Sequence, residues 1–220
     1  MQLIEDLQAE HHLIEQVLGS LRAFVTLRLA DQGDPADGSR FLAFFHRYAG
    51  DFHHDKEETI LFRALADKAE LPADRGPLLA LTDQHRRMAG LLGELEVRLG
   101  APLVTDVARQ LLQASAVDYS RSLWRHIDAE NSVLFPEGEE RLRRSHVPEL
   151  PSRPMTAEER DAQAAGLALV GTYPPQHDPE VHRGDGCIAC PSYGTACEGL
   201  ELEWWTDLEW EDFQERMTGD

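Results

Sequence analysis

Two stretches of the chain place a carboxylate four residues after a histidine: His53 precedes Glu57, and His126 precedes Glu130. Residues four apart share one face of a helix, so each pair would project from the same side. Upstream of His126 the apolar residues recur at steps of three and four, and the same steps lead on to Glu130. Both side chains are therefore expected to face the core. A buried ionised carboxylate is costly unless it is paired, and a metal ion would pair with both groups at once.

Histidines occupy the same kind of position in two further stretches. His11 interrupts an apolar stripe that extends from Ile4 to Val25, and His85 interrupts another from Leu78 to Leu99. A single histidine in such a stripe is more often a hydrogen-bonded core residue than a metal ligand. Together, however, four imidazoles and two carboxylates are about the set of donors that two divalent metal ions require. The predicted ligands are His11, His53, Glu57, His85, His126 and Glu130.

Two other interpretations of this set stay open. A single metal ion could use part of it, or the six residues could be buried without any metal ion. The last interpretation is disfavoured, because each buried polar group without a partner costs about 1–3 kcal/mol or more.

The register of the second helical stretch is ambiguous. One stripe contains Leu42, Phe45, Ala49, His53, Glu57 and Ile60, and the other contains Phe41, Phe44, Tyr48, Asp51, His54, Glu58 and Leu61. The first stripe avoids burying Asp51, so it favours His53 with Glu57 over His54 with Glu58 as ligands. His46 fits neither set well and is expected at the surface.

The periodicity predicts four long amphipathic helices joined by short connections. They are expected over residues 3–30, 39–70, 77–100 and 105–135. Ser39 is the expected N-cap of the second helix, and Pro77 suits the first turn of the third. Pro136 should end or kink the fourth, with a short helical turn at 139–144. No strand pattern competes, so the predicted fold is all-α, an antiparallel up-and-down four-helix bundle over residues 1–147.

Residues 148–220 are expected to form an irregular acidic extension. From residue 151 onward the chain has 15 Asp and Glu residues, four Arg and no Lys, and prolines mark the start of this change in composition. A capping signal at Thr156 to Glu159 predicts the start of a helix, and a short helix is expected around residues 162–169.

The extension contains all three cysteines of the chain, and their spacing from His182 suits a second metal site. Cys187, Cys190 and Cys197 with His182 could close a tetrahedral zinc site, and the thiolates could instead hold an iron–sulfur cluster. Free cysteines without metal, or a redox-active pair of Cys187 and Cys190, are the remaining interpretations.

The last part of the sequence is acidic and aromatic, with a cluster made of Trp204, Trp205, Leu208 and Trp210. Such a cluster is not expected to stay exposed. It is interpreted either as a segment that docks back on the bundle or on the cysteine segment, or as one that folds on a protein partner.

The net charge of −19 over 220 residues disfavours nucleic acid and anionic membranes as partners. The first residues lack the basic and apolar regions of a secretory signal, and no run of about 20 apolar residues predicts a membrane span. The cysteines are odd in number and do not suit a secreted disulfide framework. The cytoplasm is therefore the expected location.

The histidine motifs resemble those of the hemerythrin-like (HHE cation-binding) family. The resemblance covers about residues 3–140, and its order of His before Glu differs from the Glu-x2-His of ferritin-like bundles. It rests on Glu10-His11-His12-Leu13-Ile14-Glu15, His53-His54-Asp55-Lys56-Glu57-Glu58 with Leu61-Phe62, Gln84-His85-Arg86, and His126 to Glu130 with Leu134-Phe135-Pro136.

The resemblance implies a non-haem diiron centre, in which Glu57 and Glu130 would be bridging carboxylates. An oxygen or hydroxide bridge between the irons is usual for the family. By the same analogy the histidines divide into two pairs, one for each iron: His11 with His53, and His85 with His126.

Two differences separate this sequence from the oxygen-carrying hemerythrins. Leu81 stands where those proteins have a further histidine, and the last motif is His-x3-Glu in place of His-x4-Asp. The more open set of ligands is similar to branches that repair iron–sulfur clusters, sense iron or decompose peroxide. The predicted function is therefore binding or reaction of oxygen, peroxide or nitric oxide at the diiron site. The alternative is a sensor or iron-handling module that acts on a protein partner through the C-terminal tail.

Overall fold

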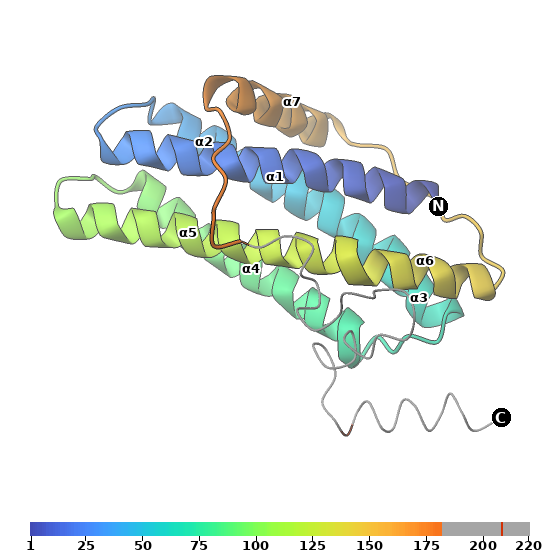
Figure 1. Ribbon diagram of the computed structural model, residues 1–220. Coiled ribbons are helices and arrows are strands. Elements are labelled where there is room, and N and C mark those ends of the chain that lie inside the picture. Colours follow the sequence, from blue (N-terminus) through green and yellow to red (C-terminus); the bar gives the residue numbers. More distant parts are fainter. Residues whose placement is uncertain (182–207, 209–220) are drawn as a thin grey trace.

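The computed structural model describes residues 1–181 and Leu208, and over this part of the chain the regular structure is entirely helical (Figure 1). Long helices lie side by side and pack against one another as a bundle. No helix in the described residues is long and apolar enough to cross a membrane. The all-α prediction is confirmed for this part of the chain.

The helices of the bundle follow one another in four continuous stretches, called rods 1 to 4 below. Rod 1 is α1 (Gln2–Leu29), and rod 2 consists of α2 (Ala36–Ala43), η1 (Phe44–His54), η2 (Glu57–Phe62) and α3 (Arg63–Lys68). Rod 3 is α4 (Gly76–Gly100), and rod 4 consists of α5 (Asp106–Ala129), η3 (Glu130–Leu134) and α6 (Phe135–Arg144). A separate helix, α7 (Ala157–Thr172), follows.

The starts of the helices test the expected capping residues. Pro77 lies in the first turn of α4, as predicted, where its missing N–H costs least. The expected N-cap at Ser39 is wrong, because rod 2 already begins at Ala36. At this earlier start, three residues before Ser39, Asp34 Oδ1 accepts a hydrogen bond from the Ala36 N–H (2.9 Å).

Pro136 does not end rod 4. It occupies a first-turn position of α6, directly after the wide turn η3, and α6 then continues to Arg144. The missing N–H of a proline is tolerated at such a position. The short turn expected at 139–144 is thus part of a longer helix.

The wide π-type turns of the bundle coincide with the histidine motifs: η1 ends at His54, η2 begins at Glu57 and η3 begins at Glu130. In a π-helix the hydrogen bonds join residues five apart, so each turn takes in more residues than an α-helical turn. The buried residues of rod 2 recur every four residues as neighbouring pairs: Phe44 and Phe45, Tyr48 and Ala49, Phe52 and His53, Lys56 and Glu57. Parts of both predicted stripes are therefore buried together.

Two apolar clusters lie on either side of the histidine motifs. One cluster includes Leu18, Phe45, Leu92 and Leu123, and the other includes Leu7, Leu61, Leu81 and Val133. Along each rod, the buried apolar residues before the histidine motif belong to one cluster, and those after it belong to the other. Packing of the two clusters therefore fixes the position of the polar residues along the bundle axis.

The helix α7 packs against α1, α2 and η1, and its residues Ala162 and Leu169 join the first apolar cluster. The predicted capping signal is confirmed as a reciprocal pair: Thr156 Oγ1 accepts a hydrogen bond from the Glu159 N–H (3.2 Å), and the Glu159 carboxylate accepts one from the Thr156 N–H (2.6 Å). The helix is longer than the expected segment at 162–169.

The chain after α7 lies against rods 1 and 4. The Gln176 N–H donates a hydrogen bond to the Gly19 carbonyl (3.0 Å). The buried Asp178 carboxylate pairs with Arg121 (2.7 Å) and Arg22 (3.2 Å), and its hydrogen bond with Arg121 lowers the pKa of Asp178 to about 2. The described part of the extension is thus held by ion pairs as well as by apolar contacts.

Gly166→Ala is expected to destabilise the docking of α7. An added Cβ would meet the ring of the buried Phe44, with a Val17 methyl group at 3.2 Å, and overpacking of this kind costs about 1–3 kcal/mol. Gly171→Ala in the same helix is the matched control, because nothing lies within 4 Å of its added Cβ. Denaturant unfolding measures both variants, and equal stability would contradict the close approach of α7 to Phe44.

Candidate metal centre

Glu57, in the first turn of η2, lies at the centre of the bundle with its side chain fully buried. Its Oε1 atom is 3.3 Å from His53 Nε2 and 3.6 Å from His11 Nε2. Its Oε2 atom is 3.5 Å from His85 Nε2. One carboxylate therefore faces histidines from three rods, at distances longer than ordinary hydrogen bonds.

Glu130, the first residue of η3, is also fully buried and faces the same site. Its Oε2 atom is 3.1 Å from His126 Nε2 and 3.3 Å from His11 Nε2. Its Oε1 atom is 4.0 Å from His85 Nε2. Its Oε2 atom thus faces histidines of rods 1 and 4, and Glu130 belongs to the ligand group of His11, His53 and Glu57.

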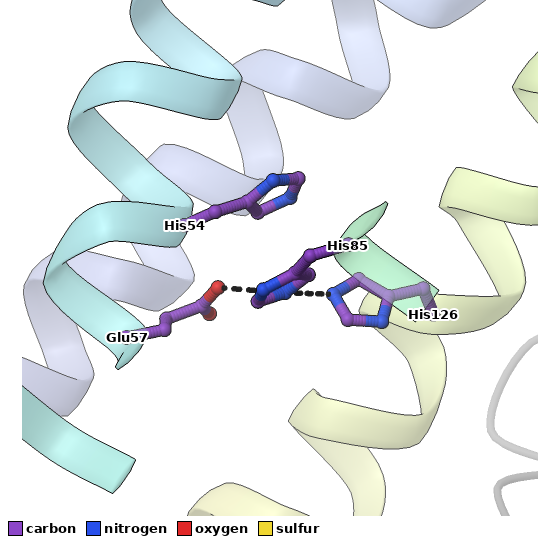
Figure 2. Close-up of side chains that lie close together, drawn as sticks. All are labelled: His54, Glu57, His85 and His126. Atoms are coloured by element: carbon purple, nitrogen blue, oxygen red, sulfur yellow. Dashed lines mark hydrogen bonds and ion pairs between the residues drawn. The ribbon is translucent and has the colours of Figure 1, made fainter. Parts of the chain in front are cut away.

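The potential ligand atoms fall into two groups, within which they lie no more than 4.8 Å apart. The groups are His11, His53, Glu57 and Glu130, and His54, Glu57, His85 and His126. Figure 2 shows the second group, in which the rings of His54 and His85 stack with their centroids 4.0 Å apart. The structure thus brings the six predicted ligands together. It also adds His54, which the sequence offered only as an alternative to His53.

Four of the histidines pair their Nδ1 atoms with an oxygen from a neighbouring rod. The pairs are His53 with Glu10 (2.9 Å), His85 with Glu58 (2.7 Å), His126 with Gln84 (2.9 Å), and His11 with Asn131 (2.9 Å). Each oxygen accepts from an Nδ1–H, so the Nε2 atom is the one that faces the centre. Partners of this kind orient the histidine ligands of metal sites.

The four oxygen donors close a ring around the bundle, and we call Glu10, Glu58, Gln84 and Asn131 the acceptor ring. Rod 1 supplies its residue to rod 2, rod 2 to rod 3, rod 3 to rod 4, and rod 4 back to rod 1. Sequence periodicity does not predict this ring. Its signal was a polar residue directly beside a predicted ligand on every rod.

Several atoms that face the centre are buried without a hydrogen-bond partner. They are the Nε2 atoms of His11, His53 and His54 and all four carboxylate oxygens of Glu57 and Glu130. Unpaired burial of charged groups is strongly unfavourable. A cation would satisfy these atoms together, and imidazole with carboxylate suits iron, zinc and related ions. The residues therefore fit a bound pair of metal ions.

Burial and neighbouring charges set the protonation of the site. Burial raises the pKa of Glu57, but the adjacent His53 and His11 outweigh this effect and hold the pKa well below its usual value. Burial keeps the pKa of His54 well below its usual value. Burial also lowers the pKa of His11, but its contacts with Glu130 and Glu57 prevail and raise it to about 10. These directions favour an ionised Glu57 and a neutral His54, whereas a metal ion at this site would displace a proton from His11.

Other predicted residues lie away from this centre. His46 is exposed, as expected. The predicted second metal site, made of His182, Cys187, Cys190 and Cys197, lies outside the described residues, as do Trp204, Trp205 and Trp210.

The chain matches the family model of the hemerythrin HHE cation binding domain over residues 2–137. This match spans rods 1 to 3 and rod 4 as far as the start of α6, and it contains every residue of both ligand groups. Searches of curated proteins and of solved structures returned no match. The order of the histidine motifs along the chain and the family model lead to the same conclusion: the chain belongs to the hemerythrin HHE cation-binding domain family.

Proposed function

We propose that the centre holds two iron ions bridged by Glu57 and Glu130. The histidines would divide between the ions, with His11 and His53 on one and His54, His85 and His126 on the other. The proposal rests on the buried Nε2 and carboxylate oxygen atoms that converge without hydrogen-bond partners. Nitrogen donors with bridging carboxylates are a donor set that non-haem iron uses, in agreement with the family resemblance.

The proposed reactant is a small molecule: oxygen, peroxide or nitric oxide. Bound iron would supply the redox chemistry, while the chain positions the ions and keeps water out. Every proposed ligand except His54 is more than nine-tenths buried, so a large substrate has no access. His54 is half-buried and the Glu58 side chain is 40% exposed. A small molecule would therefore approach between rods 2 and 3.

We infer that the four rods run alternately up and down, as expected for a hemerythrin-like bundle. Rod 1 passes from Leu7 in one apolar cluster to Leu18 in the other, and rod 2 passes from Phe45 back to Leu61. Rods 3 and 4 repeat this reversal, from Leu81 to Leu92 and from Leu123 to Val133. An alternating direction of the rods explains the reversal at each step.

A second candidate function is an iron- or oxygen-responsive sensor that acts on a protein partner through the C-terminal tail. Arg153, in the connection to α7, donates a hydrogen bond to Asp55 Oδ2 (3.0 Å) and another to the Asp51 carbonyl. These two residues flank His53 and His54. A shift of the histidines would therefore reach the start of α7 through Arg153.

Glu57→Gln is expected to lower the iron content from about two ions per chain to about one or fewer. Glutamine keeps the size of the side chain but removes the negative charge that both ions would share. Glu94→Gln, on the exposed face of α4, removes the same charge away from the centre and is the control. Elemental analysis of protein purified without oxygen measures the iron, and full iron content in Glu57→Gln would contradict the bridging role.

His54→Ala is expected to weaken one of two ferrous iron-binding steps and to leave the other intact, because His54 belongs to only one ligand group. Loss of even an outer partner of a ligand costs about 10- to 100-fold in affinity, so an effect of at least this size is expected. His46→Ala, an exposed histidine on the same rod, is the control. Two unchanged binding steps in a ferrous iron titration would remove His54 from the ligand set.

Peroxide consumption by the iron-loaded protein distinguishes the two functions. Turnover that disappears in His126→Ala would support a reaction at the iron centre. Absence of turnover, with iron-dependent protection of residues 150–220 from protease, would support the sensor. If oxygen, peroxide and nitric oxide all leave the spectrum and the protease pattern unchanged, both functions are wrong.

A further inference from the structure

One of the two lysines of the chain is buried beside the proposed iron centre. Lys56 is 1% exposed, whereas Lys68 on the same rod is exposed. A buried ammonium group is unfavourable unless it is paired with a negative charge. Lys56 directly precedes the proposed bridging ligand Glu57, so the residue that pairs with Lys56 also lies close to the centre.

The partner of Lys56 is Glu10 on rod 1. The Lys56 ammonium group donates a hydrogen bond to Glu10 Oε1 and lies 4.3 Å from the centroid of the Phe52 ring. The other carboxylate oxygen, Glu10 Oε2, accepts the Nδ1–H hydrogen bond of His53 (2.9 Å). Glu10 therefore joins the buried lysine to a proposed iron ligand, with one oxygen for each.

Glu10 differs from the rest of the acceptor ring in charge and exposure. Gln84 and Asn131 are neutral amides. Glu58 is a carboxylate, but its side chain is 40% exposed, and water screens its charge. The Glu10 side chain is only 11% exposed. Glu10 is thus the member of the ring whose charge needs a counter-charge from the protein.

We propose that Lys56 is a positioning residue of the metal centre that acts through Glu10 on His53. Its positive charge compensates the buried carboxylate and so holds Glu10 against His53 Nδ1. This contact keeps the Nε2 atom of His53 aimed at Glu57. Without Lys56 the carboxylate turns toward water and the imidazole loses its fixed orientation. The effect on metal binding rests on the proposed function, because it requires an ion between His11 and His53.

The amide members of the acceptor ring suggest a second substitution, at Glu10, that tests this role. His11 and His126 are held by amide oxygens, which carry no net charge and need no counter-charge. Glu10→Gln gives His53 the same kind of partner. Combined with Lys56→Met, it removes both buried charges and leaves a hydrogen-bond acceptor in place. If Lys56 acts through its charge, the double variant should regain the iron affinity that Lys56→Met alone loses.

Ferrous iron titration of the full chain tests this expectation. Lys56→Met keeps most of the buried volume and should weaken one of two binding steps by about 10- to 100-fold. The double variant Glu10→Gln/Lys56→Met should bind within about threefold of the wild type. Lys68→Met is the matched control and should change neither step. Equal losses in the single and double variants would reduce Lys56 to a packing role, and an unchanged Lys56→Met would also overturn the proposal.

A second readout keeps this test independent of iron. In the metal-free chain, the Nδ1–H proton of His53 should give a slowly exchanging NMR signal while it is held by Glu10 or by glutamine at position 10. Lys56→Met should exchange this proton faster, and the double variant should restore slow exchange. If the wild type binds no iron, the proposed function fails, but the exchange rate still tests Lys56. Unchanged slow exchange in Lys56→Met would overturn the proposal.

Discussion

The carboxylates of Glu57 and Glu130 are fully buried, and the rest of the structure depends on how their charge is balanced. Both lie between two apolar clusters, and both face histidine Nε2 atoms. A negative charge in such a place needs protons or cations nearby. The pKa of His11 is raised by these carboxylates, so a proton on its imidazole can balance part of their negative charge. Metal ions would provide the same balance, so proton and metal compete for the same atoms.

How far the sequence predicts this structure depends on the type of helix. The steps of three and four residues locate α1, α4 and α5 because these are α-helices of period 3.6. Steps of three and four residues do not describe rod 2, where the wide π-type turns bury neighbouring residues together. Sequence periodicity therefore offers His54 only as an alternative to His53, although both face the site. Ser39 lies inside rod 2, which already begins at Ala36, and Pro136 lies in the first turn of α6, where a proline is tolerated.

Contacts between distant residues were beyond the reach of sequence patterns. The acceptor ring depends on which rods are neighbours, and periodicity along one helix carries no such information. The same holds for α7, whose start was visible in its capping residues but whose docking depends on Gly166 and Leu169 meeting the bundle. The acidic composition after residue 151 describes the charge of that segment, while a few apolar residues determine where it packs.

The acceptor ring closes only through the contact between Asn131 and His11, which are 120 residues apart in sequence. The ribosome releases rod 1 first and rod 4 last, and chains fold as they emerge. A nascent chain that ends before residue 130 lacks both Glu130, which faces His11, and Asn131, the hydrogen-bond partner of His11. It follows that a half-synthesised chain lacks part of the site that would hold the proposed ions. If the centre holds iron as proposed, the ion would therefore enter late in biosynthesis, after the whole bundle exists to enclose it.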